Sequence, residues 1–338
     1  MNGNRIFSRT TLSASSLKTI ALVTMLIDHL GMTVVYELEQ RYLPNAGPDG
    51  LISAFLRLIG RIAFIIFAFL LVEGFINTSN RKKYVLRLLA GAVISEIPFD
   101  LAGSMKWFDP WDQNIFFTLT IGFCTIWALD VLREMRGEAG SASGNGKGDY
   151  TGSHLNSKEI RASEKSPLSS EEKRVSADST IGIACGKVPV IYTVAGILTV
   201  LTSMVIAELI RCDYGCMGIG LIVVFYLFRW RGSLFWAVLI ETYIGHIVED
   251  FIYYMVKLFR YYTQIGEPFR APGVNAVLVN LSKWASNRLI WNMPGILAAV
   301  LLIMHYNGEK GRQLPKAFYY LFYPVHLSIL YLIMRFCL

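Results

Sequence analysis

The chain has 338 residues, of which 54% are hydrophobic and only 17% are charged. Soluble domains carry about 25% charged residues, so this composition, with a mean hydropathy of +0.44, excludes an ordinary soluble enzyme. The net charge of +7 does not indicate nucleic-acid binding. The basic residues lie mainly in short gaps between apolar runs, which is the pattern of membrane topology.

The first part of the chain contains four apolar runs that are long enough to cross a bilayer. About 20 helical residues at 1.5 Å per residue span roughly 30 Å of hydrocarbon, and a helix satisfies its own backbone groups there. The first run is too long for a signal peptide, so we expect it to stay in the mature protein. The sequence predicts spanning helices at 17–36, 51–75, 84–102 and 114–132.

A polar segment at 133–187 follows these runs. It is rich in Gly, Ser, Lys and Glu and lacks an apolar period, which predicts a disordered cytoplasmic linker. The linker separates an N-terminal part, 1–132, from a C-terminal part, 188–338. Within the second part, 257–288 is mixed in polarity and is predicted to be an extracytoplasmic loop with an interfacial helix. Further spans are predicted at 188–210, 215–228, 233–254, 289–306 and 317–337.

The predicted fold is therefore an all-α polytopic integral membrane helical bundle of about nine transmembrane helices, with the lipid bilayer of the cytoplasmic membrane as its surroundings. If nine helices alternate, the basic clusters fall on one side, which the positive-inside rule makes cytoplasmic. The N-terminus is then cytoplasmic and the C-terminus extracytoplasmic. The clusters contain Arg5, Arg9, Lys18, Arg81, Lys82, Lys83, Arg229, Arg231, Lys310, Arg312 and Lys316.

The five cysteines lack the C-x-x-C spacing that is typical of zinc and redox sites. No metal is therefore expected. A disulfide between Cys212 and Cys216 at an extracytoplasmic helix end stays open at this point, subject to the geometric limits on such bridges.

Ionisable side chains inside the apolar runs cost a few kcal/mol each, so they indicate where function lies. In the first span, Asp28 and His29 are neighbours and point about 100° apart, so we expect each to face another helix. Thr24 and Thr33 extend the polar stripe. A neutral structural histidine is common, but an imidazole among several acids is also how a general base is built. His29 is therefore the leading catalytic candidate.

Arg57 and Arg61 lie one turn apart in the second span and need an anion to balance their charge. Asp28 is the nearest candidate by depth, through an arginine to carboxylate fork. The alternative is a purely structural ion-pair network. The third span ends in Ser95-Glu96-Ile97-Pro98-Phe99-Asp100, where proline should unwind or kink the helix. Other polar residues expected at comparable depth are Glu208, Asp213, Glu241, His246 and Glu249.

The remaining histidines are weaker candidates for catalysis. His246 and His326 lie at predicted helix ends, His154 lies in the linker, and His305 lies near a cytoplasmic helix end. On the cytoplasmic side, a basic patch leads into the third span. It either reflects positive-inside bias or docks a phosphorylated donor whose acyl arm enters the bundle. The patch consists of Arg81, Lys82, Lys83 and Arg87.

Six blocks of the sequence, in order, resemble the TraX family of conjugal-transfer membrane proteins. They are LKTIALVTMLIDHLG, LRLIGRIAFIIFAFLLVEGF, RKKYVLRLLAGAVISEIPFDLA, QNIFFTLTIGF, AELIRCDYGCMGIGLIVVFYLF and FYYLFYPVHLSILYLI. The resemblance implies acyl transfer, because the type member is associated with acetylation of the pilin amino terminus. It also implies a fold like that of integral-membrane acyltransferases, which pass an acyl group from cytoplasmic coenzyme A to an extracytoplasmic acceptor.

On that resemblance, acetyl-CoA is the expected donor, its phosphates held near Arg81, Lys82, Lys83 and Arg87. His29 is the expected general base, Glu96 or Asp100 would hold its tautomer, and Arg57 or Arg61 would stabilise an oxyanion or hold Asp28. The extracytoplasmic acceptor is unknown, and a pilin amino terminus or an envelope component would fit.

Two other functions remain open from the residues alone. A transporter or flippase for an anionic or acylated substrate would use Arg57 and Arg61 to bind the substrate and Asp28 with His29 to relay protons. A non-catalytic scaffold would use the same polar residues only to fix helix packing. The sequence shows no internal repeat of the kind that many transporters carry.

Overall fold

The computed structural model describes residues 12–43, 50–110, 112–144, 190–229, 232–266, 279 and 292–338. Regular structure in these ranges is helical, apart from two isolated bridge pairs, Leu12 with Tyr306 and Gln113 with Cys212. The all-α class of the fold is therefore confirmed, and the chain is a multi-pass membrane protein. Contacts divide it into two compact units, 1–128 together with 198–338, and 129–197. The first unit contains the candidate site described below.

Five described helices are long and apolar enough to cross a membrane. The expected count of about nine spans is not confirmed, because the other helices are either shorter or more polar. Arg81–Ser104, for example, carries four basic residues in its first two turns. The five candidate spans are Ala14–Tyr42, Leu51–Asn77, Ile115–Gly137, Val190–Leu209 and Ala317–Phe336.

The first span is not one regular α-helix. It consists of α1, Ala14–Leu30, a π-helical turn at Gly31–Val35, and α2, Tyr36–Tyr42. Thr33 Oγ1 donates to the His29 carbonyl oxygen at 2.6 Å within this stretch. A single π-helical turn inserts one residue into the helix and is frequent at functional sites. Here it directly follows the Asp28-His29 pair.

α3, Leu51–Asn77, is the central helix of this unit and contacts α1 and α8. Its first turn is capped from another helix. The buried carboxylate of Glu39 accepts the amide N–H groups of Ile52 and Ser53 at 2.6 and 2.9 Å, which satisfies two of the donors that every helix N-terminus leaves free. Gly50 directly precedes the helix and has a φ of 65°, a conformation that glycine adopts without steric cost.

α4, Arg81–Ser104, and α5, Ile115–Gly144, both extend further than the sequence predicted. Pro98 does not unwind α4, which continues for six more residues to Ser104, because a proline removes only one backbone donor and membrane helices tolerate that loss. α5 continues past the predicted boundary at 132, since the residues that follow, such as Arg133 and Glu134, are good helix formers. The rest of the predicted linker, 145–187, lies outside the described residues.

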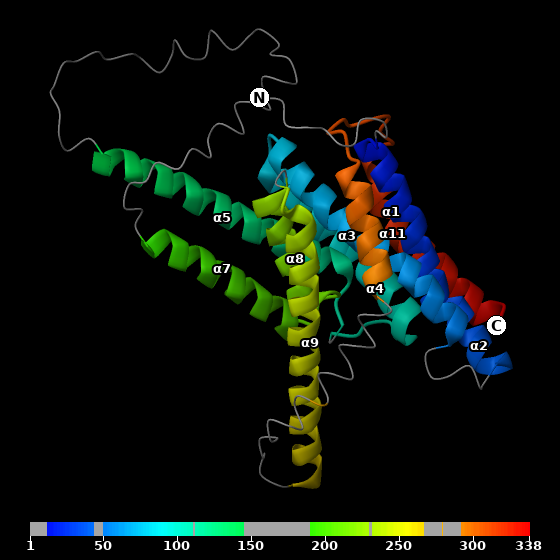
Figure 1. Ribbon diagram of the computed structural model, residues 1–338. Helices are drawn as coiled ribbons and strands as arrows, with labels where there is room; N and C mark the ends of the chain where they lie inside the picture. The colour runs from blue at the N-terminus through cyan, green and yellow to red at the C-terminus, as the bar shows by residue number, and fades with distance from the viewer. Residues whose placement is uncertain are drawn as a thin grey trace. The chain divides into compact units, whose positions relative to one another are not determined.

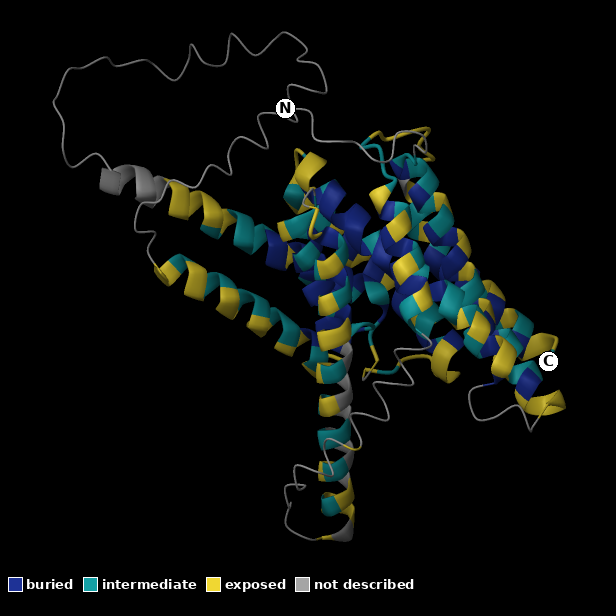
Figure 2. Cartoon of the chain, viewed as in Figure 1, coloured by how far each residue is buried: buried dark blue, intermediate teal, exposed yellow. Residues whose placement is uncertain are grey.

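The second half contains α7, Val190–Leu209, α8, Gly215–Phe228, α9, Leu234–Ile265, a short helix at Asn292–Met304, and α11, Lys316–Phe336. α9 is longer than predicted, so the expected loop begins as helix, and most of 267–291 lies outside the described residues. α7 is largely exposed, as a lipid-facing helix would be, while buried residues gather around α3 and α8 (Figure 2).

The core that positions the site is aromatic and aliphatic. Phe69 packs edge-on against Phe225, and Phe75 against Phe123, which joins α3 to α8 and α5. The first and last helices of the unit, α1 and α11, run next to each other (Figure 1). Cys212 and Cys216 are both buried and are not joined to each other, so the disulfide considered from the sequence is not formed.

Replacing Glu39 with alanine should lower the unfolding free energy by about 1 kcal/mol, the usual cost of losing a capping group. Glu37, two residues earlier, is half-buried and pairs within its own helix with Arg41 at 2.8 Å. Glu37→Ala is therefore the matched control and should change stability little. Thermal unfolding of the purified protein in detergent measures both variants. Equal melting temperatures for the two would contradict the capping role.

Candidate active site

His29 on α1 forms a buried hydrogen bond with a second histidine. Its Nδ1 lies 2.5 Å from Nε2 of His326 on α11, and the two rings stack with their centroids 4.8 Å apart. The Tyr323 ring packs edge-on against the His29 ring, with the ring centroids 5.6 Å apart. Both histidines are less than a tenth exposed. The contact joins residues that are 297 positions apart in the chain.

The partners of His326 decide which nitrogen of His29 carries the proton. Nδ1 of His326 lies 2.7 Å from the Phe322 carbonyl oxygen, and a carbonyl can only accept, so this nitrogen carries the hydrogen. In a neutral ring, Nε2 of His326 is then an acceptor. It must receive the proton of His29 Nδ1. The Nε2 atom of His29 is therefore unprotonated, with a lone pair free to accept a proton.

Asp28 packs against Gly60 of α3. A Cβ atom at Gly60 would lie 2.2 Å from the Asp28 side chain, so only glycine leaves room for the carboxylate. Arg61 and Arg57 both act on the charge of Asp28, Arg61 more strongly. The Oδ1 atom of Asp28 is buried and has no hydrogen-bond partner. The two arginines thus supply positive charge near the carboxylate, and its Oδ1 atom remains available to accept a hydrogen bond.

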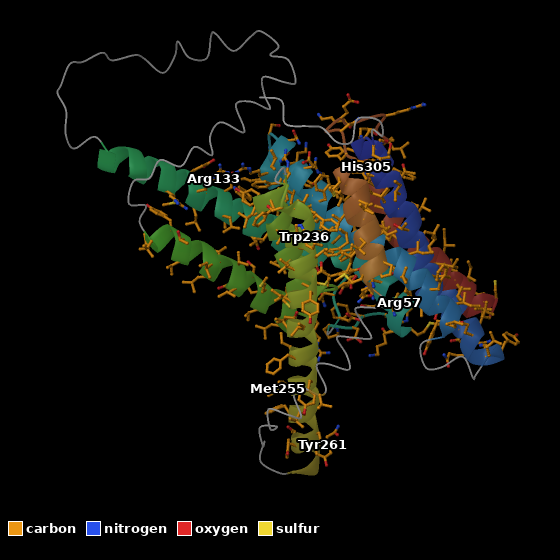
Figure 3. The ribbon with its side chains drawn as sticks, viewed as in Figure 1. Arg57, Arg133, Trp236, Met255, Tyr261 and His305 are labelled. Carbon is orange, nitrogen blue, oxygen red and sulfur yellow. The ribbon has the colours of Figure 1, made fainter. Side chains whose placement is uncertain are left out.

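The two arginines of α3 differ in their surroundings. The guanidinium carbon of Arg61 lies 6.0 Å from the centroid of the Tyr214 ring, and Arg61 interacts electrostatically with Asp28 and Asp213. Arg57 is exposed and lies at the edge of the helices (Figure 3). Both arginines act on the charge of Asp28, but Arg61 is the one that lies beside the Tyr214 ring.

Asp213 and Tyr214 lie in the tight connection between α7 and α8. This connection is held by backbone bonds to the segment before α5: Gln113 N–H donates to Arg211 at 3.0 Å and Asp213 N–H donates to Gln113 at 2.9 Å. Burial raises the pKa of Asp213 to about 7, because the loss of hydration outweighs the opposing effect of Arg61. Asp213 can therefore change charge near neutral pH.

These residues line one end of a cavity of about 440 Å³. We call this the inner end, and it is formed by Asp28, His29, Gly60, Asp213, Tyr214 and Tyr323. Apolar side chains of α1, α3 and α5, such as Met25, Phe64 and Phe116, line the middle. The cavity therefore leads from the imidazole along an apolar passage within the bundle.

The other end of the cavity, which we call the basic end, contains Lys18, Asn77, Arg87, Lys310 and Gln313 with Tyr84, Tyr319 and Tyr320. Lys18 lies over the Tyr319 ring at 4.7 Å, and Arg87 over the Tyr84 ring at 5.5 Å. The Nε atom of Arg87 is buried without a hydrogen-bond partner. Eleven helical positions separate Lys18 from His29, so the two ends lie roughly 16 Å apart along α1.

Of the predicted donor-binding patch, only Arg87 lines the cavity. Arg81 instead covers the Phe75 ring at 4.4 Å, and Lys82 and Lys83 are exposed. The other two cavity cations, Lys18 and Lys310, come from segments that the sequence marked only as basic clusters. Lys18 and Lys310 line the basic end together with Arg87, because α1, α4 and the segment before α11 meet there.

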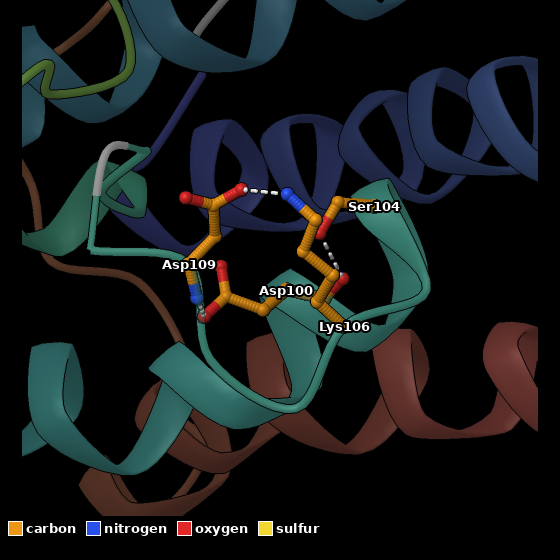
Figure 4. Close-up of polar contacts among 4 residues, drawn as sticks. All are labelled: Asp100, Ser104, Lys106 and Asp109. Atoms are coloured by element: carbon orange, nitrogen blue, oxygen red, sulfur yellow. Dashed lines mark hydrogen bonds and ion pairs between the residues drawn. The ribbon is translucent and has the colours of Figure 1, made fainter.

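Glu96 and Asp100 of α4 do not hold His29, which corrects the role predicted for them. Glu96 accepts from the Asn114 side chain, and Asp100 accepts from the Asp109 amide at 2.7 Å, with Lys106 bonded to Asp109 at 2.8 Å (Figure 4). Both acids organise the connection from α4 to α5. The partner of His29 Nδ1 is His326. The sequence ranked it below His29 because it was assigned to a helix end, which is wrong: it lies in the middle of α11, Lys316–Phe336.

The remaining polar residues lie elsewhere. Glu208 accepts from the Cys216 amide at 2.7 Å and caps α8. Glu241 lies against Gly220 and Gly245 at the α8 to α9 contact, and His305 ends the short helix at the other end of the bundle from Arg57 (Figure 3). His154 and the side chains of His246 and Glu249 lie outside the described residues. Tyr214 and Tyr323 went unrecognised, because tyrosines are frequent throughout this chain.

The sequence resembles known proteins over its first part. Residues 13–138 match the family model described as TraX protein, which confirms the resemblance for the part that contains Asp28, His29, Arg61 and Arg87. A relative named "Probable fimbrial assembly protein FimC, serogroup H1" from Dichelobacter nodosus is 30% identical over 127 residues, 34% of this chain and 45% of the relative. The chain thus matches less than half of that relative's length. No solved structure matches the chain.

Gly60→Ala should push the Asp28 carboxylate away from α3 and destabilise the protein by about 2 kcal/mol, the usual cost of overpacking. Gly103, also in a helix, has open space around its Cα, so Gly103→Ala should be neutral or stabilise by up to about 1 kcal/mol. Melting temperatures of the purified variants compare the two. A stable Gly60→Ala protein would show that Asp28 does not need this contact.

The raised pKa of Asp213 predicts a pH dependence of stability. The folded protein holds this proton up to about pH 7, whereas an unfolded aspartate loses it near pH 4. Native protein therefore binds more protons between these values, and its stability falls as pH rises from 4 to 7. The melting temperature of wild type relative to Asp213→Asn should decline across that window. A constant difference would contradict burial of the carboxyl.

Proposed function

We propose that this protein is an integral-membrane acyltransferase that uses acetyl-CoA and passes the acyl group to an extracytoplasmic acceptor. The observation that carries the proposal is the cavity that joins a cluster of cations and aromatic rings to the free Nε2 atom of His29. A thioester of a phosphorylated carrier needs these features: a site for its phosphates, an apolar passage for its arm, and a base at the end of the passage.

The basic end is suited to the phosphates of the donor. Lys18, Arg87 and Lys310 supply positive charge there, and Glu73, the acid nearest along the wall, is already neutralised by Arg229 at 2.8 Å. An extended phosphopantetheine arm has about the length of four to five extended residues, roughly 15 Å. This matches the distance along α1 from Lys18 to His29, so a thioester carbonyl would reach the imidazole.

The same cations support a proposed orientation of the protein in the membrane. Lys18, Arg87 and Lys310 belong to the clusters that the positive-inside rule places in the cytoplasm, where coenzyme A thioesters are available. The inner end then lies deeper in the membrane, toward the opposite face. The acceptor would approach His29 from that face.

His29 acts as general base on the acceptor in this proposal. Its Nε2 takes the proton from the attacking amine or hydroxyl, the nucleophile bonds to the thioester carbonyl carbon, and the C–S bond breaks. The proton then passes to the leaving thiolate. His326 holds the required tautomer as an orienting partner, in the way that an acid does in other catalytic sites. Where the nucleophile is an amine, Oδ1 of Asp28, which has no partner in the protein, accepts its second hydrogen.

The acceptor is proposed by similarity. The relative from Dichelobacter nodosus is named for fimbrial assembly, and the TraX family model covers the residues that bear the base. A pilin amino terminus, or another envelope component with a nucleophilic nitrogen or oxygen, fits a site whose base faces away from the cytoplasmic donor.

Membrane vesicles that contain the protein should release coenzyme A from radiolabelled acetyl-CoA and incorporate label into an envelope component. His29→Gln should lower the turnover number by roughly 10²- to 10⁴-fold, the usual contribution of a general base. His305→Gln is the matched control, because His305 does not line the cavity and its Nδ1 lies 2.7 Å from the Leu301 carbonyl oxygen. It should leave turnover unchanged.

Two outcomes would contradict the proposal. Wild-type turnover in His29→Gln would remove the imidazole from the reaction. Proton-coupled movement of a solute in proteoliposomes, without release of coenzyme A, would favour the transporter that the sequence left open.

A further inference from the structure

Tyr214 has an unusual backbone conformation at the inner end of the cavity. Its φ and ψ of 65° and −3° lie in the left-handed region, which costs free energy for a residue with a large side chain. Its ring stacks on Phe64 with centroids 3.8 Å apart and an angle of 15° between the planes. The fold thus holds this phenol in one fixed position, beside the residues that surround His29.

The hydroxyl of Tyr214 has one hydrogen that its neighbours leave available. A phenol can accept hydrogen bonds and donate one, whereas a guanidinium can only donate. The Arg61 guanidinium carbon lies 6.0 Å from the centroid of the Tyr214 ring, and a guanidinium can approach the phenol oxygen only as a donor, so it leaves the phenol hydrogen available. A nearby cation also polarises the O–H bond, which strengthens the hydrogen bond that the phenol can offer.

The surroundings place this hydrogen where charge would develop during acyl transfer. Tyr214 lines the same cavity as His29, and it interacts electrostatically with Asp28 and with Tyr323, whose ring contacts His29. Arg61 does not line the cavity. Its positive charge would therefore reach a bound substrate through the phenol, not by direct contact.

We infer that Tyr214 is a catalytic residue that donates a hydrogen bond to the carbonyl oxygen of the thioester as it becomes an oxyanion, with Arg61 as its positioning residue. The inference rests on the proposed acyltransferase function. When the nucleophile bonds to the carbonyl carbon, the carbonyl electron pair moves to oxygen and Tyr214 stabilises it. When the C–S bond breaks, the pair returns and the thiolate takes the proton from His29.

Tyr214→Phe tests this role, because phenylalanine keeps the ring against Phe64 and removes only the hydroxyl. The turnover number should fall by roughly 10²- to 10³-fold, the usual effect of losing one oxyanion donor, while KM for acetyl-CoA stays within about twofold because the donor's phosphates bind at the other end. Tyr226 lies in the adjoining helix α8 and packs against Phe75. Tyr226→Phe is the matched control and should leave turnover unchanged.

A second measurement covers the case in which Tyr214→Phe fails to fold. Site-specific 3,5-difluorotyrosine at position 214 keeps the shape of the side chain and makes the phenol more acidic. Activity should then be lost at lower pH than in wild type, since a deprotonated phenol cannot donate. Arg61→Lys should lower turnover in the same direction without changing KM, as expected for a residue that acts through Tyr214.

The outcomes separate this inference from the proposed function. Wild-type turnover in Tyr214→Phe, combined with loss of turnover in His29→Gln, would overturn the oxyanion role and leave the acyltransferase standing. An unchanged pH profile of the fluorinated protein would overturn it as well. Absence of acyl transfer by the wild-type protein would overturn the proposed function and the role of Tyr214 with it.

Discussion

The hydrogen bond between His29 and His326 is the contact on which the arrangement of the site depends. It joins the first and last helices of the chain, and in a buried environment neither imidazole could leave its polar atoms without partners at low cost. The chain of bonds from the Phe322 carbonyl through His326 fixes the proton on Nδ1 of His29. A helix packing contact thus also sets the chemistry, because it leaves the lone pair of Nε2 free.

The sequence predicted the helical class and the importance of the first span, because apolar length and buried charge are local properties of a segment. It predicted that Asp28 and His29 would face different helices, and the structure confirms this, with Asp28 against Gly60 and His29 against His326. The identity of the partner was beyond prediction. Nothing in α1 indicates a residue 297 positions away, and Glu96 was the more usual type of partner for a histidine.

Sequence spacing did not determine which neighbour each side chain meets. Arg57 and Arg61 are one turn apart and both act on the charge of Asp28, but Arg61 is the one that lies beside the Tyr214 ring. The dense basic patch in the sequence begins with Arg81, Lys82 and Lys83. Of the whole patch, however, only Arg87, one helical turn further along, lines the cavity. A spacing rule gives the direction of a side chain to within about a quarter of a turn, and which neighbour it meets depends on packing between helices.

The inner end of the cavity contains polar atoms that the protein alone does not satisfy. Asp28 Oδ1 has no hydrogen-bond partner, Nε2 of His29 carries a free lone pair, and Tyr214 retains a hydrogen to donate. Leaving a buried atom such as Asp28 Oδ1 without a partner costs roughly 1 to 3 kcal/mol, which a fold selected only for stability would avoid. An amine nucleophile with two hydrogens and a carbonyl oxygen would satisfy all three groups at once. These groups would therefore bind the reacting atoms most strongly when charge develops on them.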